Sequence, residues 1–347
     1  MTTVNISAID VFCGAGGLTH GLQKAGIDVQ LGIDIDPSCE YPFTSNNKAS
    51  FLKKSIVDLK YKDIKNYFNK EGYKLLAGCA PCQTFSSYFT KASATDERWS
   101  LLLEFSRLVK ETSPDIVTME NVTGLKYQSV FSEFISNLKD ENYHVWFEVL
   151  DTSLYGLPQK RKRLVLLASK LGEIRILSPE ELKSRPKSVK KAISKLPKLE
   201  AGQTDPKDSL HTSASLSDLN MKRMKASKPN GTWRDWDDDL VADCHKKKSG
   251  QTYPSVYGRM SWDQPAPTMT TQFYGFGNGR FGHPEQDRAI SLREGAIFQG
   301  FPKNYKFIQP KTTINKSSIG RLIGNAVPVK LGEVIGKSII YHLKNLP

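Results

Sequence analysis

Cys82 is the residue of this sequence best placed for covalent chemistry, since it stands in Ala80-Pro81-Cys82-Gln83 directly after an apolar stretch. Pro81 restricts the backbone beside the thiol. A cysteine on a loop at the end of a strand, near positive charge, ionises readily, and its thiolate is a strong nucleophile. The segment therefore predicts a group-transfer enzyme that works through a covalent cysteine adduct.

Two further side chains could manage the charge that such a reaction develops. Glu120 closes an apolar stretch in Glu120-Asn121-Val122, and Arg163 ends the basic run Gln159-Lys160-Arg161-Lys162-Arg163. A carboxyl group shielded from water can donate a proton, and a guanidinium group can stabilise negative charge. Because another apolar stretch follows Arg163 directly, we expect its side chain near the sheet rather than in bulk solvent.

A glycine-rich segment near the start of the chain, Asp10-Val11-Phe12-Cys13-Gly14-Ala15-Gly16-Gly17-Leu18, predicts a site for a nucleotide-like cofactor. Its glycines let the backbone approach a ligand, and a following helix would offer free N–H groups. The spacing is not G-x-G-x-x-G, so a dinucleotide is not indicated. Asp34 ends the next apolar stretch and could accept both hydroxyls of a ribose, and Asp58 could meet an adenine amino group.

The five cysteines, at positions 13, 39, 79, 82 and 244, are odd in number and widely spread. They are expected to be thiols, because a chain of this size does not need disulfides for stability. Cys79 and Cys82 form a C-x-x-C pair, but no second pair or matched histidine pair follows, so no metal site is expected. A redox pair remains an alternative, although thioredoxin-like proteins place theirs after the first strand of a small domain.

Apolar stretches alternate with helical patterns over the first half of the chain. Strands are expected at residues 6–12, 29–35, 73–77, 115–119 and 163–168, and helices at residues 18–25, 101–110 and 131–138. This alternation predicts an α/β fold with a doubly wound, mostly parallel sheet. Reactive residues of such a sheet gather at the carboxyl ends of its strands.

Beyond about residue 182 the sequence becomes polar and irregular, with a short strand-like piece at Ser255-Val256-Tyr257. Helical patterns return at residues 292–299 and 329–343. We expect a catalytic, cofactor-binding domain over 1–182 and 311–347, with 183–310 inserted as a small irregular domain. Residues 183–306 hold 22 Lys and Arg against 13 Asp and Glu, most of the net charge of +13, so this insertion is the candidate surface for a polyanion.

The sequence has no apolar run long enough to span a bilayer and no secretory leader pattern at its start. We therefore expect a cytoplasmic protein without a membrane partner.

Together these segments resemble the DNA cytosine-5 methyltransferases of bacterial restriction-modification systems. The resemblance covers nearly the whole chain, and its blocks stand in the order of the family. The blocks are 10–17, 81–83, 120–122, 159–163, 288–294 with 299–302, and 324–327. The stretch from 183 to about 262 has no counterpart pattern.

The resemblance implies the S-adenosylmethionine-dependent methyltransferase fold with an inserted target-recognition domain, S-adenosylmethionine as cofactor and S-adenosylhomocysteine as product. The cofactor contacts that it implies are Phe12, Gly14, Gly16, Gly17, Leu18, Asp34, Ile35, Asp58, Leu59, Pro81, Asn325 and Val327. Ile35 stands where the family often has an aromatic residue, which implies weaker stacking on the adenine.

The implied reaction transfers a methyl group to C5 of a flipped-out cytosine in a specific duplex DNA sequence. Cys82 would add to C6, Glu120 would donate a proton at N3, and Arg163 would bind O2, while Arg161 would support the cysteine loop or the base. The residues expected to contact DNA are Gln83, Ser86, Arg234, Tyr257, Arg259 and Arg280. Aromatic residues alternate with basic ones in this region, and any one of them could instead belong to the core of the small domain.

Other readings of the same residues stay open. One branch of the family methylates tRNA, although the long basic insertion here favours DNA. A protein that only recognises a flipped base would have lost Cys82, Glu120 or Arg163, and all three are present. We expect a monomer that acts at the nucleoid of a bacterium, with an independently acting restriction endonuclease as its candidate partner.

Overall fold

The computed structural model describes residues 4–69, 71–81 and 100–346, so Cys82, Gln83 and Ser86 lie outside the described residues. The chain divides into two compact units. The first comprises Met1–Tyr155, Lys162–Ser184 and Ala326–Pro347, and the second comprises Gly156–Arg161 and Arg185–Asn325. The second unit thus includes residues 311–325, which the sequence pattern assigned to the first domain. That the two units divide catalysis and target recognition remains a prediction.

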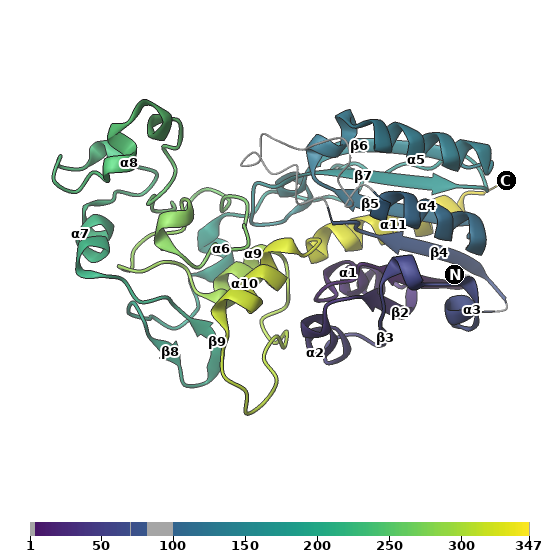
Figure 1. The fold of residues 1–347 in the computed structure, drawn as a ribbon, viewed down its shortest axis with the longest axis horizontal. Helices are drawn as coiled ribbons and strands as arrows, with labels where there is room; N and C mark the ends of the chain where they lie inside the picture. Colours follow the sequence, from purple (N-terminus) through teal and green to yellow (C-terminus); the bar gives the residue numbers. More distant parts are fainter. Residues whose placement is uncertain (1–3, 70, 82–99, 347) are drawn as a thin grey trace. The chain divides into compact units, whose positions relative to one another are not determined.

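The first unit is built on a seven-stranded sheet in the order β3-β2-β1-β4-β5-β7-β6 (Figure 1). Its strands are β1 (Ile6–Val11), β2 (Asp28–Asp34), β3 (Ser50–Lys53), β4 (Tyr73–Gly78), β5 (Ile116–Asn121), β6 (His144–Asp151) and β7 (Lys162–Ser169). The first five strands are parallel, and β7 runs antiparallel between β5 and β6. The expected doubly wound, mostly parallel sheet is confirmed.

The sequence pattern missed β3 and β6, the two strands at the edges of this sheet. Their side chains are mostly exposed or half-buried, so neither strand has the continuous apolar run of the central strands. The place of Glu120 also differs slightly from the expectation. Strand β5 continues through Asn121, so Glu120 lies within the strand and not just after it.

Helices cover both faces of the sheet in Figure 1. The helices of this unit are α1 (Gly17–Ala25), α2 (Glu40–Thr44), α3 (Tyr61–Ile64), α4 (Ser100–Thr112), α5 (Ser129–Asp140) and α11 (Val329–Lys344), and short 3-10 turns are η1 (Pro37–Cys39), η2 (Ile56–Asp58), η3 (Lys65–Tyr67), η6 (Thr123–Tyr127) and η7 (Thr152–Tyr155). Successive side chains of a strand point to opposite faces. In β7, Leu164 and Leu166 therefore pack with α4 and α5, whereas Val165 and Leu167 pack with α1 and α11.

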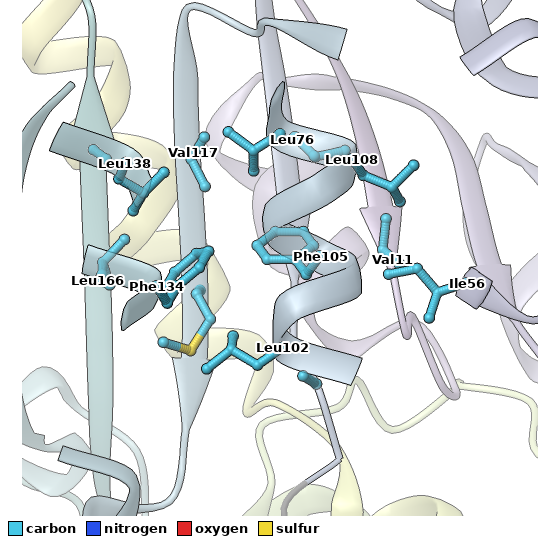
Figure 2. Packing of buried hydrophobic residues seen from close by; sticks show 14 of the residues in the cluster. Val11, Ile56, Leu76, Leu102, Phe105, Leu108, Val117, Phe134, Leu138 and Leu166 are labelled. Carbon is cyan, nitrogen blue, oxygen red and sulfur yellow. The ribbon is translucent and has the colours of Figure 1, made fainter. Parts of the chain in front are cut away.

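The core on the α4 side is assembled from large apolar side chains (Figure 2). Phe105 of α4 and Phe134 of α5 lie with ring centroids 5.9 Å apart. The same cluster contains Leu76, Val117 and Leu166, each from a different central strand. This packing fixes the strands whose ends carry the candidate catalytic residues.

On the opposite face, α11 packs against α1. Gly21 of α1 allows this contact, because a Cβ there would lie 2.3 Å from the carbonyl oxygen of Val329 and 2.5 Å from the backbone nitrogen of Glu333. The last helix is thus tied to the helix that follows the glycine-rich segment.

The second unit is irregular, as expected. It contains α6 (Val189–Ile193), β8 (Thr204–Asp205), β9 (Asp208–Thr212), α7 (Asp218–Ala226), η8 (Trp233–Asp235), α8 (Asp243–Lys246), η9 (Lys248–Thr252), η10 (Phe276–Asn278), α9 (Leu292–Phe298) and α10 (Lys316–Asn325). The strand-like piece at residues 255–257 is instead a turn in which Tyr257 has φ 55°. Ring contacts of Tyr257 with Trp236 and Phe276 hold this turn, so tertiary packing overrides the β-propensity of the piece.

None of the helices in the described ranges has both the length and the apolar character needed to cross a membrane.

Candidate active site

Glu120 and Arg163 meet at one edge of the sheet because β7 is antiparallel to β5. The register pairs Glu120 with Val165 and Asn121 with Leu164, so the beginning of β7 lies beside the end of β5. The guanidinium Nε of Arg163 lies 3.0 Å from Oε1 of Glu120, and their side chains are only 13% and 4% exposed. The two charged groups that the sequence singled out thus form a largely buried ion pair.

Cys79 also contacts this carboxylate. Its thiol donates a hydrogen bond of 3.1 Å to Oε2 of Glu120. The other oxygen, Oε1, faces the charge of Arg163 but accepts no hydrogen bond from the described residues. Oε2 of Glu120 therefore accepts a hydrogen bond from the thiol, whereas Oε1 can still accept one.

The segment that leads to Cys82 is held at the same edge. Asn121 donates from its side-chain amide to the carbonyl oxygen of Ala80 at 3.0 Å, and its Oδ1 accepts from the backbone N–H of Val122 at 2.8 Å. Pro81, which follows, is half-buried. The described structure thus brings together Glu120, Arg163 and the chain immediately before Cys82.

Arg161 lies in the second unit and is buried there. It donates to the carbonyl oxygens of Met269 at 2.8 Å and Gly324 at 3.0 Å. Its neighbour Gln159 accepts from the backbone N–H of Met269 and donates to the carbonyl of Phe298. This arrangement favours a supporting role for Arg161, which fixes the backbone next to Asn325.

The glycine-rich segment after β1 has an unusual backbone. Phe12, Gly14 and Gly16 have φ values of 62°, 53° and 85°, and a Cβ at Gly14 would meet no atom within 4 Å. The N–H of Gly14 donates to Oδ2 of Asp34 at 2.9 Å. The left-handed residues leave open space beside the backbone, as a ligand cradle requires.

Two carboxyl groups lie at this segment. Asp10 accepts from the hydroxyl of Thr19 at 2.6 Å through Oδ2, whereas its buried Oδ1 has no hydrogen-bond partner among the described residues. Burial raises the pKa of Asp10 to about 7 and also raises the pKa of Asp34. Asp34 accepts backbone N–H groups from Gly14 and Asp36. Such a pair fits a ligand with a positive charge and hydroxyl donors.

Two exposed apolar side chains are sequence neighbours of Asp34 and Asp58. Ile35 follows Asp34 and is 66% exposed, and Val57 precedes Asp58 and is 55% exposed. Exposed apolar surface of this kind suits the faces of an adenine ring. Sequence reasoning missed Val57, although it directly precedes Asp58, which the sequence analysis had singled out.

Some of the expected cofactor contacts can be made only by the backbone. The side chains of Leu18, Leu59 and Val327 are buried in the two cores, whereas Asn325 is exposed at the end of α10. Within the first unit, the open glycine segment and the Oδ1 of Asp10, which has no hydrogen-bond partner among the described residues, fit the S-adenosylmethionine that the sequence resemblance implies.

Arg107 of α4 is a second residue that sequence reasoning missed. Its Nη2 donates to the carbonyl oxygens of Ile56 at 2.9 Å and Leu59 at 3.0 Å, which flank Asp58. Glu104 and Glu111 hold the rest of the guanidinium group. The turn that carries Val57 and Asp58 is thereby anchored to α4.

The residues expected to contact DNA differ in how available they are. Arg259 is buried and donates to the carbonyls of Ser227, Met224, His283 and Gln286 and to the carboxylate of Asp287. Tyr257 is half-buried among rings, and Arg280, whose pKa is lowered by burial, donates to the carbonyl of Gly231. Arg234 is exposed beside the ring of Trp233. The structure thus favours Arg234 as a surface contact and Arg259 as an internal support.

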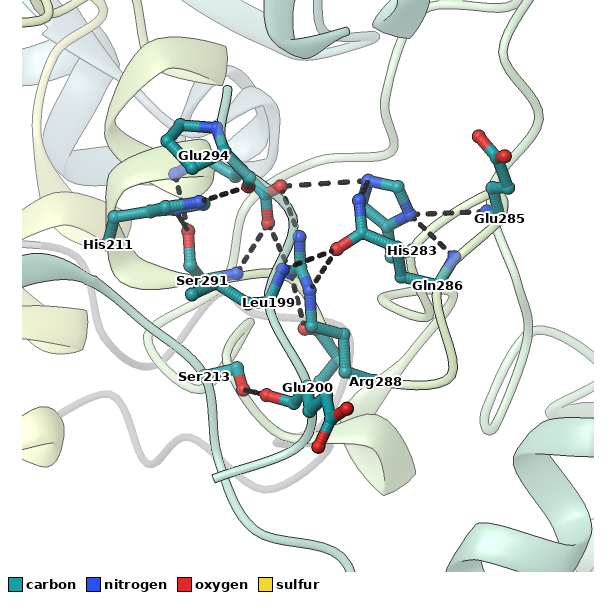
Figure 3. A network of polar contacts seen from close by, with 12 residues as sticks. Leu199, Glu200, His211, Ser213, His283, Glu285, Gln286, Arg288, Ser291 and Glu294 are labelled. Atoms are coloured by element: carbon teal, nitrogen blue, oxygen red, sulfur yellow. Dashed lines mark hydrogen bonds and ion pairs between the residues drawn. The ribbon is translucent and has the colours of Figure 1, made fainter. Parts of the chain in front are cut away.

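The sequence block at residues 288–294 forms a buried polar network (Figure 3). Arg288 donates two hydrogen bonds, of 2.7 and 2.8 Å, to the carboxylate of Glu294, and both side chains are almost fully buried. Although burial opposes ionisation, Arg288 holds the pKa of Glu294 at about 2, and burial lowers the pKa of neighbouring His283 to about 4. This block supports the second unit and needs no ligand to explain it.

Comparisons with known proteins agree with this arrangement. The family model described as C-5 cytosine-specific DNA methylase matches residues 6–341. The chain is 49% identical to the Type II methylase M.HgiDII of Herpetosiphon aurantiacus, with 98% of this chain and 96% of that protein covered. It is 29% identical to the Type II methyltransferase M.Eco47II of Escherichia coli, with 98% and 80% covered.

Solved structures show the same fold. A protein described as a DNA modification methyltransferase encoded within a prophage of E. coli has a TM-score of 0.75 at 24% identity, with 98% of this chain and 100% of that chain covered. The Dnmt2 methyltransferase of S. pombe has a TM-score of 0.64 at 17% identity, with 99% of each chain covered.

Proposed function

Since the chain belongs to the C-5 cytosine-specific DNA methylase family and is a DNA cytosine-5 methyltransferase of the restriction-modification type, we propose the following substrate and mechanism. It methylates C5 of a flipped-out cytosine in a specific duplex sequence through a covalent Cys82 adduct. Flipping is required because a stacked base exposes neither face of C6 to a nucleophile.

S-adenosylmethionine is the proposed cofactor, and when bound it supplies a methyl group on positively charged sulfur, which C5 receives. The glycine segment and Asp34 would hold its sugar, and Ile35 and Val57 its adenine. Asp34, and Asp10 where the pH exceeds its pKa of about 7, would place negative charge near its cationic end. The open backbone beside Gly14 and the unpaired Oδ1 of Asp10 support this assignment.

The residues of this chain perform the remaining steps. The Cys82 thiolate forms a bond to C6, and the displaced electron pair makes C5 nucleophilic. Glu120 gives a proton to N3, and Arg163 stabilises the charge that develops at O2. After methylation a water molecule removes the C5 proton, the electron pair reforms the C5–C6 double bond, the thiolate leaves, and N3 returns its proton to Glu120.

One observation carries the proposal. Glu120 and Arg163 form a largely buried pair at the strand edge where Asn121 also holds the carbonyl of Ala80, two residues before Cys82. An acid, a cation and the chain that leads to the nucleophile, from three different parts of the sequence, thus lie at one place. Proximity of this kind is what covalent catalysis requires.

The test uses duplex DNA that contains 5-fluorocytosine in place of cytosine, with the methyl donor present. Fluorine at C5 cannot leave as a cation, so the Cys82 adduct should persist and appear as a protein–DNA conjugate in a denaturing gel. Cys82→Ser should form no conjugate, whereas Cys244→Ala, which removes an exposed thiol of the second unit, should form it normally. Absence of the conjugate with folded wild-type protein would overturn the mechanism.

We also propose that the second unit reads the target sequence, and that Arg234, Tyr257, Arg259 and Arg280 contribute to this reading. Gln83 and Ser86, which follow Cys82 in the sequence, would add contacts to the DNA. The exposed side chain of Arg234 supports direct contact, and the bonds of Arg259 support a role in holding the reading surface. Bisulfite sequencing of DNA from cells that express the protein would report the methylated site. Arg234→Ala should weaken binding to DNA that contains that site. Bisulfite sequencing of tRNA from the same cells would reveal an RNA substrate.

A further inference from the structure

We propose that Cys79 is a positioning residue, whose thiol donates to Glu120 and sets the direction of that carboxylate. This inference rests on the proposed function, because it concerns the residue that would protonate the cytosine. It assigns to Cys79 a role separate from that of Cys82 and from a disulfide between the two.

The sheet register explains why these two side chains meet. Strands β4 and β5 are parallel, with Ala77 opposite Thr118 and Gly78 opposite Met119. Cys79 and Glu120 follow directly after this last pair, so continuation of the register would place them opposite each other. Paired residues of neighbouring strands point to the same face of a sheet, so the sulfur and the carboxylate lie side by side.

Arg163 lies on this face as well. Val165 and Leu167 of β7 belong to the core on the α1 and α11 side, so Arg163, two residues before Val165, points to that side. Cys79 packs against the same core, and its backbone N–H donates to the carbonyl of Val11 at 3.2 Å. The thiol is therefore held in place by β1 while it donates to Glu120.

The two partners of Glu120 act differently. Arg163 supplies a full charge at Oε1 without a hydrogen bond, whereas the thiol supplies a directed hydrogen bond at Oε2. A hydrogen bond to a carboxylate fixes the plane of the group. Cys79 thus directs the carboxylate, which the charge of Arg163 alone does not do.

A spectroscopic experiment tests the contact without any turnover. The S–H stretching frequency falls when a thiol donates a hydrogen bond, and it can be followed by Raman spectroscopy of the full protein. The Cys79 band is the one lost in Cys79→Ala, and the exposed Cys244 thiol, identified by Cys244→Ala, serves as the internal reference. We expect the Cys79 band below the Cys244 band, and we expect Glu120→Gln to raise it. A Cys79 band that coincides with the reference and ignores Glu120→Gln would overturn the inference.

A kinetic experiment tests the consequence. Ala and Ser are similar in volume, but only Ser keeps a donor. The rate of conjugate formation with 5-fluorocytosine DNA should be measured for both variants and for Cys244→Ala. In Cys79→Ala the rate should fall roughly ten-fold, because the carboxylate has lost the hydrogen bond that directs it. Cys79→Ser should retain most of the wild-type rate, and Cys244→Ala should leave it unchanged.

The outcomes separate the two proposals. Equal rates for Cys79→Ala, Cys79→Ser and wild type would show that Cys79 only fills space, even if the methyltransferase mechanism is correct. If the wild-type protein forms no conjugate, the proposed mechanism fails, and the Raman band alone decides whether Cys79 donates to Glu120.

Discussion

The side-chain amide of Asn121 donates a hydrogen bond of 3.0 Å to the carbonyl oxygen of Ala80. This bond joins the end of β5 to the segment that precedes Cys82. Asn121 is buried, so the bond is shielded from competing water. Strand β5 thereby positions both the proposed proton donor, Glu120, and the segment that leads to the proposed nucleophile.

Asn121→Ala should lower the rate of methyl transfer roughly ten-fold and reduce the free energy of unfolding by about 1 kcal/mol, because the segment before Cys82 loses its anchor. The measurements are transfer of a tritiated methyl group and urea denaturation. Asn137→Ala is the matched control, since Asn137 donates a similar hydrogen bond to Ser106 between α5 and α4. Equal losses of activity in both variants would contradict this role.

Arg163→Ala should reduce the free energy of unfolding by about 3 kcal/mol, because it leaves the buried carboxylate of Glu120 without its ion-pair partner. Replacing both members, as Glu120→Gln with Arg163→Ala, should restore much of that loss. Urea denaturation of the wild type, the two single variants and the double variant completes the cycle. Strict additivity of the two single effects would show that the pair does not interact.

Arg107→Ala should weaken binding of S-adenosylhomocysteine roughly ten-fold, about 1.4 kcal/mol. The physical reason is that the turn with Val57 and Asp58 loses the two hydrogen bonds to its flanking carbonyls. Isothermal titration calorimetry gives the dissociation constant. Arg175→Ala, which breaks an exposed ion pair with Glu181, should leave the affinity unchanged. Unaltered affinity in Arg107→Ala would remove Arg107 from the cofactor site.

The stability of the protein should depend on the protonation of Asp10. Its pKa is raised from 3.8 to about 7 by burial, so the folded protein holds a proton that the unfolded chain releases between these values. The contribution is fully present below about pH 4 and is lost as the pH rises through 7, by an amount on the order of 4 kcal/mol.

Asp10→Asn should therefore flatten the dependence of the free energy of unfolding on pH between 4 and 8, as measured by urea denaturation at each pH. Asp28→Asn removes an exposed carboxyl of the neighbouring strand and should keep the wild-type slope. A wild-type slope in Asp10→Asn would mean that Asp10 is ionised throughout this range.

Local sequence patterns were sufficient for the central part of the fold. The strands β1, β2, β4, β5 and β7 and the helices α1, α4, α5, α9 and α11 lie within a few residues of the positions expected. They could be predicted because buried strands are continuously apolar and packed helices repeat their apolar positions. The glycine segment was equally clear, since Gly14 and Gly16 adopt left-handed conformations that glycine tolerates best.

The positions of the edge strands and the exposure of side chains in the second unit could not be predicted from local sequence patterns. Strands β3 and β6 have mixed exposure and lack an apolar run. The sequence suggests Arg259 and Tyr257 as nucleic-acid contacts. In the structure, however, Arg259 donates hydrogen bonds to backbone carbonyls, and Tyr257 packs among aromatic rings. Whether a polar or aromatic side chain faces solvent depends on distant partners that no local pattern contains.

The sequence by itself determined which chemical groups are present and in what order, because residue types and short spacings are written in it directly. Only the tertiary structure decided that Cys79, Glu120 and Arg163 touch. Strands β4 and β5 are parallel while β7 returns antiparallel, and this strand order brings distant residues to one edge. Strand order is fixed by burying both faces of the sheet at once, which is a property of the whole chain and not of any segment.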